Sequence, residues 1–149
     1  MDVLKATDGW RDKVYTLALK QLFLGLDEQM LTPDGQQEIM NILQGNSEDE
    51  TIGRGPSESM AGCTANFALV KDGFLYCANA GDSRCVLCRG GQAYAMSEDH
   101  KPEQETERNR IYAAGGTVTG EGRVNGNLNL SRSLGDFEYK KNASLPAEE

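Results

Sequence analysis

Residues 64–80, TANFALVKDGFLYCANA, contain two apolar runs on either side of the dipeptide Asp72-Gly73. Aromatic and β-branched residues favour strands, and Asp-Gly is typical of the tight turn that joins two antiparallel strands. The pattern therefore predicts strands at 64–71 and 74–80 that pair as a hairpin.

Two further apolar runs follow this hairpin. They are RCVLCR at 84–89 and QAYAM at 92–96, separated by Gly90-Gly91, and the string Gly81-Asp82-Ser83 breaks the chain before them. The four runs together predict an antiparallel meander. Because apolar residues occupy both faces of these strands, we expect the sheet to be covered on both sides.

The residues before the meander favour helices. Apolar side chains recur every three or four residues over 10–31, and Thr32-Pro33-Asp34 has the composition of a new helix start, with Thr32 as the N-cap. We expect this helical pair, at 10–43, to pack its apolar stripe on the sheet. The next stretch, 44–60, is polar and rich in turn residues, which predicts a surface loop or insertion.

The residues after the meander predict one helix and a set of short strands. Glutamates early and arginines late in 103–114 complement a helix dipole, and Gly115-Gly116 is a suitable C-cap. Asn125-Gly126 is a second hairpin dipeptide. Around it we expect short strands at 116–119, 123–124 and 127–131, and then a polar tail at 142–149.

Composition excludes some classes of protein. The chain has 149 residues, 38% of them hydrophobic, and a net charge of −8 from 15 basic and 23 acidic side chains. No run approaches the ~18 apolar residues of a membrane-spanning helix. An acidic chain without a basic block is poorly suited to nucleic acid or to an anionic membrane. We see no signal peptide and expect a cytoplasmic or nuclear protein.

Four cysteines, Cys63, Cys77, Cys85 and Cys88, are interpreted as reduced and buried thiols, because nothing in the sequence indicates secretion. Cys85 and Cys88 have the C-x-x-C spacing that also occurs in metal and redox sites. They lie in a predicted strand, where residues three apart point to opposite faces, so buried thiols are the favoured interpretation.

Asp82 lies at a turn between two apolar strands, where a carboxylate either binds a hard cation or caps the turn through backbone N–H groups. Further polar strings occur at strand ends downstream. In their order along the chain, the patterns ANAGDSR, DHKP, RI..AGG.V, RVNG.L.LSR and LGD..YK resemble those of a known family. It is the type 2C family of metal-dependent protein serine/threonine phosphatases, and the resemblance runs from about Ala61 to Lys141.

This resemblance implies an α+β fold in which two antiparallel sheets form a sandwich with helices outside each sheet, an α-β-β-α arrangement. It also implies two or three Mg²⁺ or Mn²⁺ ions in the complete domain. A hydroxide that bridges two of the ions would attack the phosphorus of phosphoserine or phosphothreonine in a protein substrate. The complete form is expected to be monomeric.

Individual residues take expected roles from the resemblance. Asp82 matches a metal ligand, and Arg123 matches an arginine beside the cleft, where substrate contacts are expected. No catalytic residue is assigned within the chain. Other residues of the motifs are expected to support the site or fix its loops by hydrogen bonds: Thr64, Asp99, Asp136, His100 and Arg132.

The family's main metal-ligand strings are not found in this sequence. Asp8-Gly9 continues as Trp10-Arg11 instead of H-G-G, and no aspartate follows Asp136. We therefore interpret residues 1–149 as a partial domain, with the meander, helix and flap region at 61–141, that is inactive by itself because too few carboxylates are present to hold two hydrated ions. Two alternatives stay open: a non-catalytic binding or regulatory relative, and an unrelated α+β interaction domain whose motif agreement is accidental.

Overall fold

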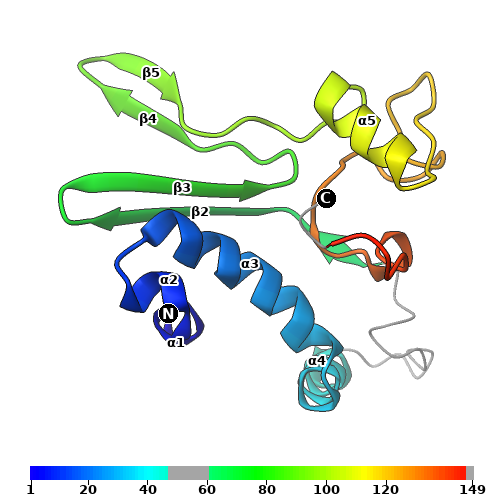
Figure 1. The fold of residues 1–149 in the computed structure, drawn as a ribbon, viewed down its shortest axis with the longest axis horizontal. Helices are drawn as coiled ribbons and strands as arrows, with labels where there is room; N and C mark the ends of the chain where they lie inside the picture. Colours follow the sequence, from blue (N-terminus) through cyan, green and yellow to red (C-terminus); the bar gives the residue numbers. More distant parts are fainter. Residues whose placement is uncertain (47–60, 147–149) are drawn as a thin grey trace.

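The structure is a computed structural model that describes residues 1–46 and 61–146. Its helices are α1 (Asp2–Ala6), α2 (Asp8–Arg11), α3 (Tyr15–Leu31), α4 (Pro33–Asn46), α5 (Glu105–Ala113) and the short 3-10 helix η2 (Phe137–Tyr139). Its strands are β1 (Gly62–Cys63), β2 (Ala65–Lys71), β3 (Phe74–Ala80), β4 (Val86–Arg89), β5 (Gln92–Ala95) and β6 (Leu134–Gly135). Figure 1 shows α3 lying along the β2–β3 hairpin, with α5 beyond one end of it. None of the helices in these two ranges is long and apolar enough to cross a lipid bilayer.

The first long helix begins later than its apolar spacing predicts. α3 starts at Tyr15 rather than at residue 10, because Lys13 has a left-handed backbone (φ 59°) that separates α3 from α2. Trp10 still packs edge-on against Tyr15, with ring centroids 5.4 Å apart. The apolar stripe therefore continues across a break in the helix, which spacing alone does not reveal.

The predicted second helix is confirmed as α4. The Thr32 hydroxyl accepts a hydrogen bond from the Gly35 N–H at 3.1 Å, which is the contact expected of an N-cap residue. The prediction of a surface loop at 44–60 is wrong for residues 44–46, which belong to α4. The rest of that prediction, at 47–60, lies outside the described residues.

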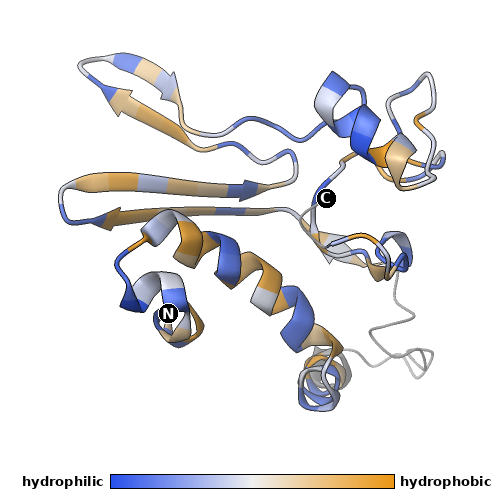
Figure 2. Ribbon diagram, viewed as in Figure 1, coloured by the Kyte–Doolittle hydropathy of each residue, from blue (hydrophilic) through white to orange (hydrophobic). Residues whose placement is uncertain are grey.

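The core is the contact between α3 and one face of the β2–β3 hairpin, and Figure 2 shows apolar residues along these elements. This confirms the expected packing of the helical stripe on a sheet. The opposite face of the hairpin is open among the described residues, since Val70 is 77% exposed there, so the expected cover on both faces is not seen among them. The buried members of the core are Leu4, Tyr15, Ala18, Leu19, Leu22 and Leu69.

The predicted meander divides into two separate hairpins. β2 pairs with β3 and β4 pairs with β5, but no backbone ladder joins β3 to β4 in the described part of the chain. Side-chain amides connect the hairpins instead. Asn79 Nδ2 donates to Glu98 O at 2.8 Å, and Asn66 Nδ2 donates to Ser97 Oγ at 3.2 Å. The described residues thus show a helical layer on one hairpin, and the layered sandwich is not seen among them.

The C-terminal part of the chain returns to the start of the β region. β1 pairs with β6 through Gly62↔Gly135, a pairing that the sequence does not predict. Asp27 of α3 accepts a hydrogen bond from the Gly135 N–H at 2.8 Å and also binds the Lys140 ammonium, which ties this pair to the core helix. The strands predicted within 116–131 reduce to isolated bridges, Val118↔Val124 and Val124↔Leu128.

Candidate functional site

Residues 81–84, here called the Asp82 turn, leave the end of β3, and each of them is held by a partner from another segment. The pairs are Gly81 with His100, Asp82 with Lys101, Ser83 with Thr64, and Arg84 with Asp99. Because 99–101 supplies three of these partners, the strings GDSR and DHKP interlock side by side. This contact gives a physical reason for the two strings to occur together in one sequence.

Ionic and hydroxyl contacts fix the outer part of the turn. The Lys101 ammonium donates to Asp82 Oδ2, and both side chains are partly exposed. Arg84 Nε donates to Asp99 Oδ1 at 2.9 Å, and this hydrogen bond lowers the pKa of Asp99 below its ordinary value. The hydroxyl oxygens of Ser83 and Thr64 lie 2.7 Å apart. Thr64 and Asp99 therefore contact the two residues that follow Asp82.

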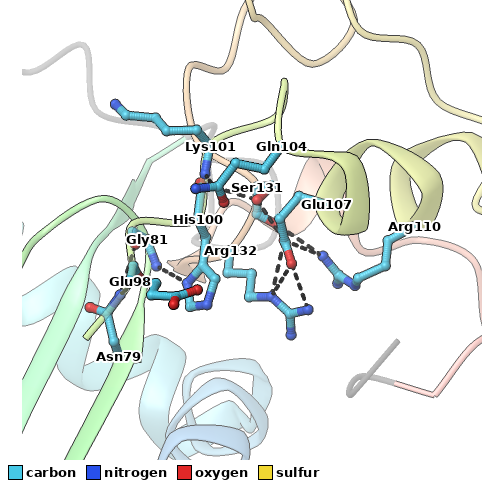
Figure 3. A network of polar contacts seen from close by, with 10 residues as sticks. All are labelled: Asn79, Gly81, Glu98, His100, Lys101, Gln104, Glu107, Arg110, Ser131 and Arg132. Atoms are coloured by element: carbon cyan, nitrogen blue, oxygen red, sulfur yellow. Dashed lines mark hydrogen bonds and ion pairs between the residues drawn. The ribbon is translucent and has the colours of Figure 1, made fainter. Parts of the chain in front are cut away.

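Gly81 allows the turn to approach its neighbours closely. Its φ is +105°, and a Cβ added there would lie 2.5 Å from Thr64 Cγ2 and 3.1 Å from Arg132 O. His100 binds this glycine twice (Figure 3). Its imidazole Nδ1 accepts the Gly81 N–H at 3.2 Å, and its backbone N–H donates to Gly81 O at 3.0 Å. The accepting Nδ1 is unprotonated. Burial, and then the nearby Arg132 charge, lowers the pKa of His100.

A buried carboxylate on α5 holds the segment at 131–132 behind the turn (Figure 3). Glu107 is 3% exposed, and its two oxygens accept hydrogen bonds from Arg132 Nε and Nη2 at 2.9 to 3.1 Å. Ser131 Oγ and Arg110 Nη1 donate to Glu107 Oε2 at 2.6 and 2.9 Å. Burial alone would raise the pKa of Glu107, but the hydrogen bonds from Arg132 and Ser131 outweigh it and lower the pKa. The Ser131 N–H donates to His100 O at 3.1 Å, so the network extends from α5 to the turn.

Asp136 and Arg123 have other partners. Asp136 is buried with a φ of 51°, its N–H donates to Ala61 O at 3.1 Å, and its carboxylate lies against Gly62. The Arg123 guanidinium donates to Asn127 O. Within residues 1–46 and 61–146, no hydrogen bond or ion pair joins either side chain to the Asp82 turn. The structure therefore brings Thr64, Asp99 and His100 to the Asp82 turn, but it gives Asp136 and Arg123 separate surroundings.

The described residues do not by themselves form a metal centre. Asp82 is the metal ligand expected from the resemblance, and its carboxylate is paired with the Lys101 ammonium. In the part of the chain that the structure describes, no three His, Cys, Asp or Glu side chains gather where they could hold one ion. Mg²⁺ and Mn²⁺ take several oxygen ligands, so these residues alone do not fit the implied centre of two or three ions.

The predicted burial of the cysteines is wrong. Cys63 and Cys88 are exposed, Cys77 and Cys85 are partly exposed, and all four are free thiols. Cys77 lies on the face of the β2–β3 hairpin opposite α3, where no helix in the described ranges packs, which explains why its side chain remains accessible.

Two groups of polar side chains were not anticipated from the sequence. Glu107 resembles the other glutamates that complement the dipole of α5, yet it is buried, and its spacing from Arg110 was the available signal. Asn66 and Asn79 interrupt apolar strands at directly opposed positions, and Asn66 Nδ2 donates to Asn79 Oδ1 at 2.8 Å. A polar pair at facing strand positions indicates that another segment is recruited there.

Comparisons with known proteins show similarity along nearly the whole chain. The family model described as Protein phosphatase 2C matches residues 10–148. "Protein phosphatase 2C 1" of Paramecium tetraurelia is 48% identical over 149 residues, which cover 100% of this chain and 46% of that protein. "Probable protein phosphatase 2C 21" of Arabidopsis thaliana is 41% identical over 153 residues, covering 99% and 41%.

A solved structure is also similar. The crystal structure of a phosphatase from a pathogenic strain of Toxoplasma gondii matches 50% of this chain and 23% of its own, with 44% identity and a TM-score of 0.48. This chain spans less than half the length of the two curated relatives described above. Their identity over nearly every residue, together with the family match, shows that the chain belongs to the protein phosphatase 2C family.

Proposed function

We propose that this chain is the central segment of a protein-serine/threonine phosphatase that hydrolyses phosphoserine and phosphothreonine in proteins. The interlock of residues 81–84 with 99–101 carries the proposal, because it holds the Asp82 carboxylate in a fixed turn at the end of a β-hairpin. Family membership supports phosphatase chemistry, and the greater length of the relatives supports a longer functional unit.

The proposed enzyme uses Mg²⁺ or Mn²⁺, held mainly by carboxylates that this chain does not supply. Asp82 is the ligand that this segment contributes, and its ion pair with Lys101 would then be shared or released. The α-β-β-α sandwich belongs to the longer protein, in which further strands cover the open face of β2–β3 around Val70. By itself the chain is inactive in this proposal.

The proposed substrates are phosphorylated proteins, and Arg123 is their contact in this segment. A guanidinium has five N–H donors, and the hydrogen bond to Asn127 O leaves others for a phosphate or an acidic side chain. The net charge of −8 favours proteins over nucleic acid or anionic membranes as partners. We place the enzyme in the cytoplasm or nucleus as a monomer.

Hydrolysis of phosphoserine and phosphothreonine peptides by the full-length protein, followed over a Mn²⁺ titration, tests the proposal. Asp82→Asn should lower turnover by at least about 10- to 100-fold, because changing a residue that only orients a metal ligand already costs this much. Asp34→Asn, an exposed aspartate on α4, is the matched control and should change nothing. A folded full-length protein that hydrolyses neither peptide at any Mn²⁺ or Mg²⁺ concentration would overturn the proposal and favour the non-catalytic relative.

A further inference from the structure

The position of the Asp82 turn depends on His100, which lies in the middle of segment 99–101. Two hydrogen bonds join His100 to Gly81, one at 3.2 Å from the Gly81 N–H to Nδ1 and one at 3.0 Å from the His100 N–H to Gly81 O. The two chain neighbours of His100 bind the charged residues of the turn. A residue that fixes His100 therefore also fixes the turn.

Residues 131–132 connect His100 with Glu107 of α5, as Figure 3 shows. The Ser131 N–H donates to His100 O at 3.1 Å, and the Ser131 hydroxyl donates to Glu107 Oε2 at 2.6 Å. The Arg132 guanidinium donates to the same carboxylate from Nε and Nη2 at 2.9 to 3.1 Å. Glu107 therefore holds both residues of the segment that contacts His100.

The backbone of Arg132 also lies against the turn. A Cβ added to Gly81 would lie 3.1 Å from Arg132 O and 2.5 Å from Thr64 Cγ2, so the Gly81 backbone is enclosed from two sides. Because packed protein interiors transmit strain, a shift of 131–132 should move Gly81 instead of being absorbed between them. Asp82 is the next residue in the chain, so the shift reaches its carboxylate.

The surroundings of Glu107 make it a firm anchor for this segment. Its side chain is 3% exposed and belongs to α5, and it accepts hydrogen bonds from Arg110 as well as from Ser131 and Arg132. The low local dielectric of a buried site strengthens such charged hydrogen bonds. An exposed ion pair would fix its partners far less well.

We propose that Glu107 is a positioning residue, which acts through residues 131–132 and His100 to hold the Asp82 turn in place for the phosphatase reaction. The inference rests on the proposed function, and in it Glu107 acts only through other residues. Loss of the carboxylate lets 131–132 shift and loosens the contact between His100 and Gly81. Asp82 is then less often in its productive position.

Peptide hydrolysis by the full-length protein tests the effect on the reaction. Glu107→Gln should lower kcat by about 10- to 100-fold, because a misplacement of about 1 Å can cost about 100-fold, and it should leave KM unchanged. Glu107→Gln should cause little further loss when Asp82 is already changed to Asn, since both changes then act on one turn. Glu105→Gln, at an exposed site on α5, is the control and should leave kcat unchanged.

Hydrogen exchange of the same proteins, followed by mass spectrometry, gives a readout that does not depend on activity. In Glu107→Gln, the peptides that contain Gly81 and His100 should exchange at least about fivefold faster, the factor for one typical hydrogen bond, while those of β2 keep their rate. Ser131→Ala removes one donor to Glu107 and no charge. It should show the same local change to a smaller extent, and it decides the matter if Glu107→Gln does not fold.

The two measurements separate this inference from the proposed function. A wild type that hydrolyses neither peptide overturns the proposed function, and the exchange rates then still decide whether Glu107 holds the turn. With an active wild type, unchanged exchange at Gly81 and His100, or an equal rise in β2, would overturn the inference alone. So would an unchanged kcat in Glu107→Gln, or losses from Glu107→Gln and Asp82→Asn that multiply in full.

Discussion

Glu107 is a single carboxylate that forms ion pairs with two arginines and positions them. It is buried and accepts hydrogen bonds from Arg110, Ser131 and Arg132. Glu107→Gln keeps the shape of the side chain, but it replaces the carboxylate that both guanidinium groups contact with a neutral amide. We expect the free energy of unfolding, measured in urea, to fall by about 1.5–3 kcal/mol, the range for hydrogen bonds to charged groups. The loss stays below the about 3–5 kcal/mol of a fully buried pair, because both arginines remain partly exposed.

Glu105→Gln is the matched control for this change, since Glu105 is exposed on the same helix. It should alter the free energy of unfolding by less than about 0.5 kcal/mol. The lowered pKa of Glu107 means that its stabilisation is present at neutral pH and is lost as the pH falls below the ordinary carboxyl value of about 4.3. The difference between wild type and Glu107→Gln should therefore shrink toward acid. Equal stability at pH 7 would contradict the prediction.

His100 is the one histidine in the sequence, so proton NMR can follow its titration without overlap from another imidazole. Burial, and then the Arg132 charge, lowers its pKa, so we expect a midpoint below the ordinary value of about 6.5. As the pH falls, the unfolded chain then binds a proton before the folded chain does. The free energy of unfolding should therefore decrease as the pH falls below about 6.5. Arg132→Met should raise the midpoint, whereas Arg108→Met, at an exposed site on α5, should not. A wild-type midpoint at or above the ordinary value would contradict this account.

Among the elements, the turn after β3 depends on Gly81, and comparison with Gly73 separates two effects. Both glycines have positive φ, but a Cβ at Gly73 meets nothing within 4 Å, whereas one at Gly81 meets Thr64 and Arg132. Gly73→Ala should cost about 1–2 kcal/mol for backbone strain alone, and Gly81→Ala about 1–3 kcal/mol more for the clash. Thermal unfolding measures both. Adding Thr64→Ser removes the methyl group that lies 2.5 Å from the new Cβ and should restore part of the stability of Gly81→Ala. No recovery would show that this methyl group is not the cause.

Elements set by local residues were predictable, and those set by distant contacts were not. The β2–β3 hairpin follows from Asp72-Gly73 and the runs beside it. Where β3 and β4 do not pair, Asn79 bonds to Glu98, 19 residues away, and no local pattern encodes this contact. In the site, the resemblance identified Asp82 together with 99–101, but the burial of Glu107 depends on Arg132, 25 residues later.

At the scale of the whole molecule, the described chain has one face of its central hairpin packed and the other open. The packed face carries Leu69 against α3, and the open face carries Val70. A strand buried on both sides would show apolar residues on both faces, and β2 and β3 have this composition. The residues are therefore suited to a second layer, which the proposed longer protein would supply.

Val70→Asp tests whether the open face of the β2–β3 hairpin is covered in the longer protein. In this chain Val70 is 77% exposed, so the new carboxylate stays hydrated and the free energy of unfolding should fall by less than about 1 kcal/mol, mainly from lost strand propensity. In the longer protein, a covering layer would bury an unpaired charge at a cost of about 3 kcal/mol or more. Urea unfolding of both proteins, with the uncharged Val70→Thr as control, measures the difference. An equally small effect in both would show that this face stays open, and the sandwich would then have to be withdrawn from the proposed fold.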